Sequence, residues 1–362
     1  MLQKLSSFAG IQGPVVIIVI DGYGLPDSDA GSAIAAASKP TLDRLFAGYP
    51  NIRLRAHGTA VGMPSDDDMG NSEVGHNAIG AGQVYSQGAA LVAGAIADGS
   101  IWQGEAWRQI VAGARAGRGT IHFIGLFSDG NVHSHIDHLR AMVVQARAEG
   151  IRAVRIHALL DGRDVPETSA LEYVTPFEAF LGEISSDGFD ARIASGGGRQ
   201  NITMDRYDAN WAMVEKGWRT HVLGEGQQFA NATAAVNGLR EQNPGTIDQD
   251  LPPFVIGENG EAIGTIEDGD SVVFFNFRGD RAIEISRAFD EPGFARFDRV
   301  RAPQVTYAGM LQYDGDLKLP ARFLVAPPAI RDTMGEWFSQ AGLNQFACSE
   351  TQKFGHVTYF WN

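Results

Sequence analysis

The pattern of apolar and polar residues predicts a short buried strand near the N-terminus. Residues 15–20 are six consecutive β-branched apolar residues, bounded by Pro14 and Asp21. A continuous apolar run of this length is typical of a strand that is buried on both faces of a parallel sheet. Asp21, followed by glycine, therefore stands where this strand is expected to end.

Weaker patterns predict further elements at both ends of the chain. The spacing at residues 40–46 predicts a short helix whose apolar side chains face inward, namely Leu42, Leu45 and Phe46. A helix start or tight turn is expected after Gly75, through about Gly82. Three more strands are predicted, at residues 51–56, 341–348 and 356–361.

The middle of the chain alternates short apolar strands with Ala-rich helical patterns. The predicted strands cover residues 120–127, 153–160, 191–195 and 272–277, and the predicted helices cover residues 138–148, 171–181 and 209–215. Such alternation indicates βαβ units and a mostly parallel sheet. We therefore expect an α/β protein of two domains, in which residues 89–316 are inserted between residues 1–88 and 317–362.

Composition narrows the class of protein. A hydrophobic content of 44% and a charged content of 20% are those of a soluble globular protein. The net charge of −14 argues against general affinity for nucleic acid or an anionic membrane. The single cysteine, Cys348, excludes an intrachain disulfide. No bilayer-length apolar run or secretory signal is found, so a cytoplasmic location is expected.

Four polar clusters follow the predicted strands of the middle domain, at residues 128–135, 161–164, 196–206 and 276–281. The carboxyl ends of parallel strands share one edge of a sheet, so the clusters are expected to gather there. Five arginines would then surround one cleft: Arg163, Arg199, Arg206, Arg278 and Arg281. Guanidinium groups suit phosphate and carboxylate oxygens, so the acidic chain is predicted to bind an anion there.

Each member of these clusters also has a plainer interpretation. Any single arginine is most often a surface residue, and Gly196–Gly198 are compatible with simple turn chemistry. His133 and His135 lie on the same side of an extended segment, so a shared metal is geometrically possible. We favour a hydrogen-bonding or proton-transfer role for His133.

The other notable stretch, residues 66–77, contains three acids, Asn71, Ser72, a glutamate and a histidine. Gly70 and Gly75 bracket the serine, so a bulky anion can approach the backbone there. The plainer alternative is that Ser72 caps a helix. Asp21 likewise has two interpretations, as a ligand of a divalent cation or as a turn residue.

Together these motifs resemble the phosphoglycerate mutases that do not require bisphosphoglycerate, within the alkaline phosphatase superfamily. The match rests on Asp21-Gly22, on Gly-Asn-Ser-Glu-Val-Gly-His at residues 70–76, and on Leu-Asp-Gly-Arg-Asp at residues 160–164. It extends to Asn-Phe-Arg-x-Asp-Arg at residues 276–281 and to residues 349–358. The spacing from Gly198 to Tyr207 is similar to the plant and trypanosomatid branch.

The resemblance implies a fold, a reaction and its cofactors. The fold is an alkaline-phosphatase-like parallel sheet interrupted by an inserted α/β transferase domain. The reaction interconverts 3-phosphoglycerate and 2-phosphoglycerate through a phosphoserine on Ser72. It uses two Mn²⁺ or Mg²⁺ ions and no bisphosphoglycerate, and Asp21 and Ser72 match ligands of one ion. A monomer without nucleic-acid or membrane partners is expected.

The resemblance also assigns roles to individual residues. Lys353 matches a lysine that offsets phosphate charge near the serine, and Asp164 matches the acid–base that shuttles the proton of the glycerate hydroxyl. The residues that match substrate contacts are His133, Arg163, Arg199, Arg206, Arg278 and Arg281.

One departure from the family pattern leaves two alternatives open. The family continues beyond the position of Asn362, where it supplies the remaining metal ligands, so a truncated and inactive chain with an incomplete phosphatase-like sheet is expected. One alternative is a metal-dependent phosphomonoesterase, in which water takes the phosphoryl group from Ser72. The other is a chain that binds phosphoglycerate without turnover.

Overall fold

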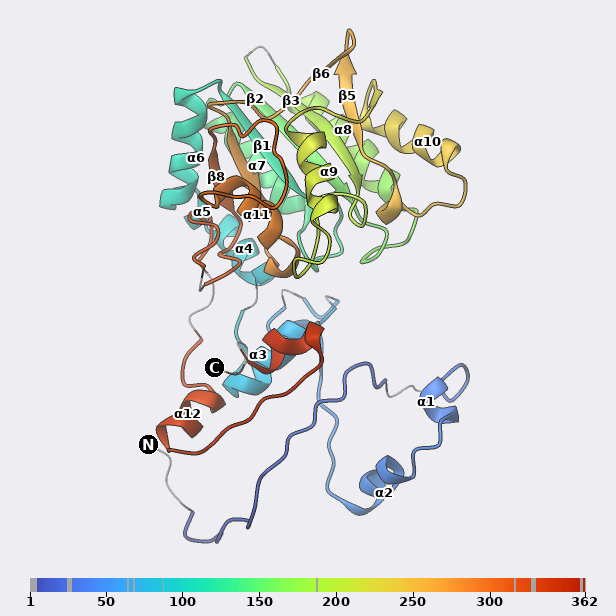
Figure 1. The fold of residues 1–362 in the computed structure, drawn as a ribbon, viewed down its shortest axis with the longest axis vertical. Coiled ribbons are helices and arrows are strands. Elements are labelled where there is room, and N and C mark those ends of the chain that lie inside the picture. The colour runs from blue at the N-terminus through green and yellow to red at the C-terminus, as the bar shows by residue number, and fades with distance from the viewer. Residues whose placement is uncertain are drawn as a thin grey trace.

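The computed structural model describes residues 5–24, 28–63, 65–67, 69–86, 88–186, 188–315, 317–326, 330–358 and 361. One sheet with helices on both faces forms the main body in Figure 1. Beyond one end of this body lie α1 (Ala33–Ala36), α2 (Pro40–Gly48), α3 (Ser72–Ala81) and α12 (Met334–Gln340).

The central sheet is mixed but mostly parallel. Its strands run in the order β4-β5-β3-β2-β1-β7-β8, and β6 pairs with β5 outside this order. Only the β3–β5 and β5–β6 pairs are antiparallel among these strands. The strands are β1 (Thr120–Leu126), β2 (Ala153–Leu160), β3 (Asp190–Gly198), β4 (Gln227–Phe229), β5 (Phe254–Glu258), β6 (Glu261–Ala262), β7 (Ser271–Phe274) and β8 (Thr306–Gly309). The four strands predicted for the middle of the chain are thus confirmed, with β7 shorter than expected.

Helices cover both faces of the sheet. One face packs against α4 (Gly88–Ala97), α5 (Ser100–Gln103), α6 (Glu105–Ala116), α7 (Ile136–Ala148), α8 (Ala170–Ile184) and α10 (Ala232–Gln242). The other face packs against α9 (Trp211–His221) and α11 (Ile283–Asp290). The three helices predicted for the middle domain correspond to α7, α8 and α9. The last begins later than expected because Asn210 caps it through the backbone N–H of Met213.

Alternation along the strands separates the two cores. Phe123 and Ile156 face the six-helix side, whereas Ile124 and Leu159 face α9 and α11, and all four are fully buried. Successive strand residues point to opposite faces, so apolar residues at every position are required when both faces are covered. This arrangement explains the continuous apolar strands of the middle domain.

Short helical turns complete the described chain. They are the 3₁₀ turns η1 (Gly58–Val61), η2 (Asp248–Asp250), η3 (Gly279–Arg281) and η4 (Thr351–Lys353), followed by α13 (Phe354–Val357). No helix of the described ranges has the length and apolar character that crossing a bilayer requires. The division into residues 1–88, 89–316 and 317–362 stays a prediction.

The predictions for the terminal segments are wrong in part. Residues 15–20 form no strand, and their side chains are 45–77% exposed. Residues 51–56 and 341–348 also lack strands, and the predicted strand at 356–361 begins within α13 and includes 359 and 360, which lie outside the described residues. A strand needs a neighbour to satisfy its backbone groups, and no other described segment pairs with these. The expected phosphatase-like sheet is therefore not formed by the described residues.

The helix predicted at residues 40–46 does form, as α2, but its apolar side chains do not face a core. Leu45 is 41% exposed and Phe46 is 49% exposed. Helical periodicity predicts that these side chains share a face, but it does not supply a surface for that face to cover.

Candidate active site

The N-terminus of α3 presents the hydroxyl of Ser72. The side chain of Asn71 caps this helix by accepting the backbone N–H groups of Glu73 (3.0 Å) and Val74 (3.2 Å). Ser72 is the first helical residue, so the interpretation of Ser72 as a helix cap is wrong. Its hydroxyl is free to make contacts outside the helix.

Those contacts are with two residues that the sequence places far away. The Ser72 hydroxyl donates to Oδ2 of Asp21 over 3.2 Å, and the Lys353 ammonium lies 2.5 Å from Ser72 Oγ. The same ammonium lies 2.6 Å from Asp21 Oδ2. Its hydrogen bond lowers the pKa of Asp21. Three residues predicted to act together are therefore in contact.

These groups fit part of a divalent-cation site. Two oxygen ligands on adjacent vertices of an octahedral Mg²⁺ site lie about 3 Å apart, close to the observed separation of Asp21 Oδ2 and Ser72 Oγ. However, no group of three or more His, Cys, Asp or Glu side chains in the described ranges is arranged to hold a metal. The described residues therefore supply two ligands and not a complete site, and the two-metal prediction stays a prediction.

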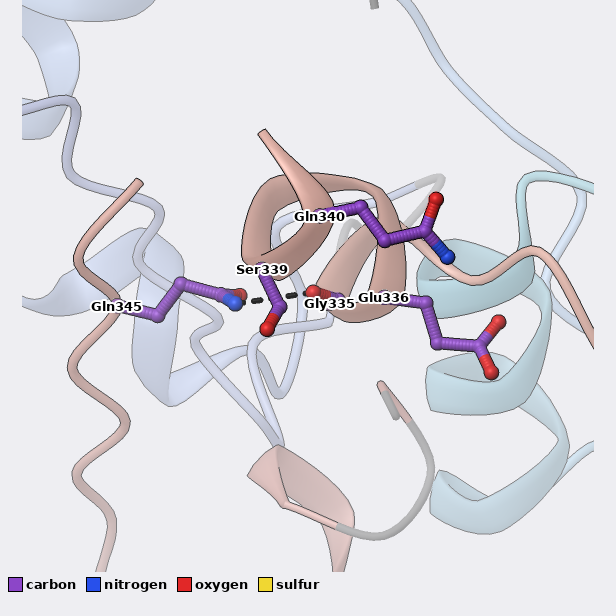
Figure 2. Close-up of a pocket in the computed structure, with 5 residues that line it drawn as sticks. All are labelled: Gly335, Glu336, Ser339, Gln340 and Gln345. Atoms are coloured by element: carbon purple, nitrogen blue, oxygen red, sulfur yellow. Dashed lines mark hydrogen bonds between the residues drawn. The ribbon is translucent and has the colours of Figure 1, made fainter. Parts of the chain in front are cut away.

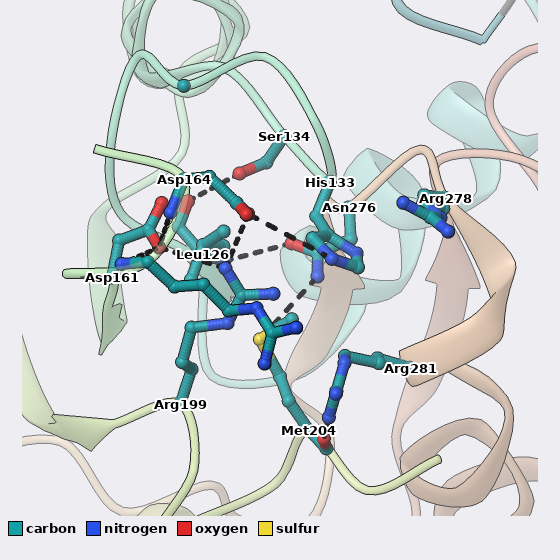
Figure 3. A network of polar contacts seen from close by, with 12 residues as sticks. Leu126, His133, Ser134, Asp161, Asp164, Arg199, Met204, Asn276, Arg278 and Arg281 are labelled. Carbon is teal, nitrogen blue, oxygen red and sulfur yellow. Dashed lines mark hydrogen bonds and ion pairs between the residues drawn. The ribbon is translucent and has the colours of Figure 1, made fainter. Parts of the chain in front are cut away.

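Arginines predicted to surround one cleft gather at the carboxyl edge of the sheet, among them Arg199, Arg278 and Arg281 (Figure 3), and we call this group the arginine cleft. His133 lies between the loop after β2, which carries Asp164, and the segment after β7, which carries Arg278 and Arg281. Its backbone carbonyl accepts the N–H of Phe277 over 2.7 Å, which ties the loop after β1 to the segment after β7. The parallel order of the strands is what gathers these separate loops.

The acid–base candidate Asp164 is held by Arg199. The guanidinium of Arg199 is 1% exposed, and its Nη1 hydrogen-bonds to the carboxylate of Asp164 and, over 2.8 Å, to Oδ1 of Asp161. His133 Nε2 lies 4.0 Å from Oδ2 of Asp164. The carboxylate is thus fixed in place and reaches the space beside the histidine.

The cleft has an excess of positive charge. Burial lowers the pKa of His133 well below its usual range, and the charges of Arg199, Arg278 and Arg281 lower it further, so the imidazole is neutral. Burial, and then the charge of Arg199, lowers the pKa of Arg281 to about 10. Burial is the larger cause of both shifts, repulsion among the cationic groups adds to it, and a bound anion would relieve this repulsion.

Several donors in the cleft also lack partners. Among the described residues, the buried Nε atoms of Arg199, Arg206 and Arg278 make no hydrogen bond. The Nε of Arg206 lies 3.3 Å from Oδ2 of Asp280, and the Nε of Arg278 lies 3.9 Å from Oε2 of Glu73. A buried donor without a partner is unfavourable by about 1–3 kcal/mol. Buried Nε–H donors that make no hydrogen bond, on three guanidinium groups of the cleft, therefore indicate an anionic ligand.

Arg163 stands apart from the other predicted contacts. Its side chain is exposed, and its backbone N–H donates to Oδ1 of Asp161 over 3.1 Å. Its charge nevertheless contributes to the lowered pKa of Arg281, so it lies at the rim of the cleft.

The interpretation of His133 and His135 as joint metal ligands is wrong. His135 turns away to cap α7, where its Nδ1 accepts the N–H of Asp137 over 3.1 Å. His133 instead faces Asp164 and Asp280.

Two carboxylates that organise the cleft received no role from the sequence. Asp161 accepts the Ser128 hydroxyl over 2.6 Å in addition to the Arg199 guanidinium. Asp280 lies 3.1 Å from Nη2 of Arg278 and 3.6 Å from Nδ1 of His133. Both aspartates lie inside the motifs quoted above, and their proximity to several arginines was the available signal.

The serine and the cleft are neighbours. Oε2 of Glu73, the residue after Ser72, lies 3.9 Å from Nε of Arg278. The helix that carries the candidate nucleophile therefore adjoins the arginine cleft.

A separate hollow beside α12, drawn in Figure 2, does not share this chemistry. It is lined by Gly335, Glu336, Ser339, Gln340 and Gln345. Its one charged side chain, Glu336, accepts the backbone N–H of Thr333 over 3.0 Å in the cap of α12. The hollow offers no cationic group to an anion.

The fold and the site define an α/β protein in which a serine at a helix N-terminus adjoins a cleft lined by guanidinium groups. Residues 92–315 match a family model described as "BPG-independent PGAM N-terminus". The chain belongs to the family of 2,3-bisphosphoglycerate-independent phosphoglycerate mutases. The family expected from the sequence motifs is thus confirmed.

Individual relatives agree with this membership. The chain is 57% identical to a probable 2,3-bisphosphoglycerate-independent phosphoglycerate mutase of Leptospira interrogans and 52% identical to the mutase of Trypanosoma brucei brucei. Each match covers 96% of this chain and 64% of the relative, so the chain spans about two thirds of their length. A solved structure of Leishmania mexicana phosphoglycerate mutase, at low cobalt concentration, is similar with a TM-score of 0.90 and 50% identity, over 95% of this chain and 63% of that one.

Proposed function

We propose that this chain carries the substrate cleft and the nucleophile of an isomerase that interconverts 3-phosphoglycerate and 2-phosphoglycerate. The observation that carries this proposal is the set of buried Nε groups on Arg199, Arg206 and Arg278 that make no hydrogen bond among the described residues, beside the helix of Ser72. A phosphomonoesterase has no need to retain the alcohol, whereas a mutase must hold glycerate between two transfers. The arginine cleft meets that second requirement.

In the first transfer, Ser72 Oγ attacks the phosphorus of 3-phosphoglycerate. A bond forms between Oγ and phosphorus as the bond from phosphorus to the 3-oxygen breaks, and the phosphoryl group remains on the serine. The Lys353 ammonium, 2.5 Å from Oγ, offsets the negative charge that collects there. Asp21, 3.2 Å away, is placed to take the hydroxyl proton.

Asp164 handles the proton of the glycerate. It gives a proton to the departing 3-oxygen and takes one from the 2-hydroxyl when that oxygen attacks the phosphoserine. When the phosphoryl group leaves Ser72 for the 2-oxygen, Asp21 returns its proton to Oγ, so Ser72, Asp21 and Asp164 all end in their starting protonation states. His133, Arg163, Arg199, Arg206, Arg278 and Arg281 hold the glycerate and the phosphate during the exchange.

The proposal for the whole enzyme includes a requirement for divalent metal ions. Asp21 and Ser72 would contribute ligands, and a bound cation would lower the pKa of the serine hydroxyl. The Leishmania mexicana enzyme was solved at low cobalt concentration, which supports a metal requirement in that relative. We propose two Mn²⁺ or Mg²⁺ ions, no bisphosphoglycerate, a monomer and a cytoplasmic location.

The test separates binding from turnover. Calorimetric titration of the 362-residue chain with 3-phosphoglycerate measures the affinity of the cleft for the substrate. Conversion to 2-phosphoglycerate, with Mn²⁺ and no bisphosphoglycerate, measures the reaction. Both assays are made on this chain and on a form extended to the relatives' length. Ser72→Ala is expected to abolish conversion and leave binding intact. Ser32→Ala is the matched control, because its hydroxyl only caps α1.

The outcomes distinguish the alternatives. Conversion that survives Ser72→Ala would refute the serine mechanism. Release of inorganic phosphate in place of 2-phosphoglycerate would favour the phosphomonoesterase. Binding without conversion in either form would leave a chain that only holds phosphoglycerate.

A further inference from the structure

A chain of buried polar side chains crosses the α9 face of the sheet and ends at the arginine cleft. Its members come from six places along the sequence: Asp270, His122, His157, Ser195, His221 and Thr203. Each is at most 2% exposed. None of these residues belongs to the proposed reaction, so the chain needs another explanation.

The contacts are continuous. His122 Nε2 lies 3.1 Å from Asp270, His122 Nδ1 lies 3.0 Å from His157 Nε2, and His157 Nδ1 lies 2.7 Å from the Ser195 hydroxyl. That hydroxyl lies 2.8 Å from His221 Nδ1, and His221 Nε2 lies 3.0 Å from the Thr203 hydroxyl. Every ring nitrogen in the chain therefore has a partner.

A bulge in β3 makes the chain possible. Ile193 pairs with Ile156, but the next pair joins Ser195 to His157, so Ala194 is an extra residue in β3. If β3 paired regularly with β2, without the bulge, Ala194 would pair with His157. Ser195 would then point to the same side as Ile193, away from the histidines. Bulges re-aim side chains in this way.

One carboxylate sets the direction of every hydrogen bond. Oδ2 of Asp270 already accepts the backbone N–H of Glu267 over 2.9 Å, and as an acceptor it requires that His122 donate from Nε2, so Nδ1 of His122 must accept from His157. By the same rule His157 accepts from Ser195, Ser195 accepts from Nδ1 of His221, and Nε2 of His221 accepts from Thr203. Burial lowers the pKa of all three histidines, that of His221 to about 3, so all three are neutral, as this pattern requires.

The chain ends on a strained residue. Thr203 has φ +68°, a left-handed backbone conformation that β-branched residues rarely adopt. Its hydroxyl is held by His221, and its backbone N–H donates to the carbonyl of Met213 over 3.0 Å. Gly217 of α9 makes room for it, since a Cβ at Gly217 would lie 2.1 Å from Thr203 Oγ1.

The strained residue is next to substrate-binding groups. Met204 follows it, and the Met204 carbonyl accepts Nη1 of Arg281 over 2.8 Å. Arg206 lies two residues further along the same loop and pairs with Asp280 at 3.3 Å. The conformation of Thr203 thus decides where two arginines of the cleft stand.

We propose that this chain is a positioning device, in which His221 and Thr203 fix the loop of residues 203–206 so that Arg206 and Arg281 are preorganised for the anion. This role rests on the proposed function, because it concerns the same cleft. A proton relay is a poorer explanation, since both ends of the chain are buried from solvent. Apolar side chains would fill the same space, but they would not hold Thr203 in its left-handed conformation.

The first test needs no ligand. Long-range ¹H–¹⁵N spectra of the imidazole rings report which nitrogen carries the proton. We expect Nε2–H on His122 and His157 and Nδ1–H on His221. A proton on Nε2 of His221 would reverse the chain at Thr203 and overturn the assignment.

The second test changes the terminal hydroxyl. Thr203→Val is expected to weaken 3-phosphoglycerate binding about tenfold, as loss of one buried hydrogen bond predicts, whereas Thr203→Ser keeps the hydroxyl and stays close to the unaltered protein. Ser271→Ala is the matched control, because its buried hydroxyl bonds to the Ile110 carbonyl, outside this chain. Unaltered affinity in Thr203→Val, or equal loss in Thr203→Ser, would overturn the proposal.

A third measurement keeps this proposal separate from the proposed function. The NMR signals of the Nε–H groups of Arg206 and Arg281 report the conformation of the loop of residues 203–206 in the absence of ligand. They are expected to shift in Thr203→Val but not in Thr203→Ser or Ser271→Ala, and unmoved signals would overturn the positioning role. If the unaltered chain binds no 3-phosphoglycerate, the proposed function fails, and these signals and the tautomers still decide the role of Thr203.

Discussion

Replacing Arg281 with methionine separates anion binding from folding. Among the described residues this guanidinium makes one hydrogen bond, to the Met204 carbonyl, and it stands among like charges. Its pKa of about 10, against an ordinary 12.5, corresponds to roughly 3 kcal/mol of unfavourable interaction of the charged form. Removal of the charge releases this energy and loses the hydrogen bond and some packing, so the free energy of unfolding should change by no more than about 1 kcal/mol.

Binding should respond much more strongly. A charge-assisted hydrogen bond to a phosphate or carboxylate oxygen contributes about 1.5–3 kcal/mol, which is roughly 10- to 150-fold in the dissociation constant. Calorimetric titration with 3-phosphoglycerate and with inorganic phosphate measures this loss, and urea unfolding measures stability. Arg192→Met is the matched control, because this arginine pairs with Asp190 and Glu258 near the start of β3, opposite the cleft.

The reasoning would be refuted by either of two results. Affinity in Arg281→Met equal to that of the unaltered chain would remove this residue from the cleft. A loss of stability of several kcal/mol would show that the arginine is structural and not held in readiness for an anion.

Three further predictions concern other titratable side chains. Arg199→Met should lower the free energy of unfolding by about 3–5 kcal/mol in urea titrations, because the substitution leaves the carboxylate of Asp161 buried without its cation. A change below about 1 kcal/mol would contradict this expectation. His221 has a folded-state pKa of about 3, so below pH 6.5 the unfolded chain binds a proton at this residue that the folded chain does not, and His221 alone should lower stability by about 2 kcal/mol from pH 7 to pH 5. A smaller slope in His221→Gln checks the assignment. Lys353→Met should raise the pKa of Asp21, observed in the carboxyl ¹³C signal, because the lysine hydrogen bond is the largest cause of its lowering; an unshifted titration would place the lysine elsewhere.

Local sequence patterns were enough to predict the strands and the polar loops in the middle of the chain. The apolar strands at residues 120–127 and 153–160 are buried on both faces by helices, so their composition alone revealed them. Because parallel strands end at one edge, the polar motifs that follow them predicted which loops would form the cleft. Arg199, Arg278 and Arg281 were found in this way.

The same reasoning failed where burial depends on a partner. Residues 15–20 have an equally apolar pattern, yet no described segment pairs with them and they are exposed. The residues around Ser72 also suggested that it caps a helix. In the structure the N-cap is Asn71, one residue earlier, and Ser72 is the first residue of α3. Periodicity reports which residues could share a surface, and it is silent on what covers that surface.

The sequence by itself determined three things: the class of fold, the polar clusters that follow the strands, and the guanidinium groups that are suited to bind an anion. Only the tertiary structure decided which groups are paired and which are left for a ligand: Asp161 and Asp280 neutralise some arginine donors, and the Nε of Arg199 remains without a partner among the described residues. It also joined His122, His157 and His221 through a single extra residue in β3. The physical reason is distance: backbone periodicity acts over a few residues, whereas hydrogen bonds and charge pairing are settled between segments that only the folded chain brings together.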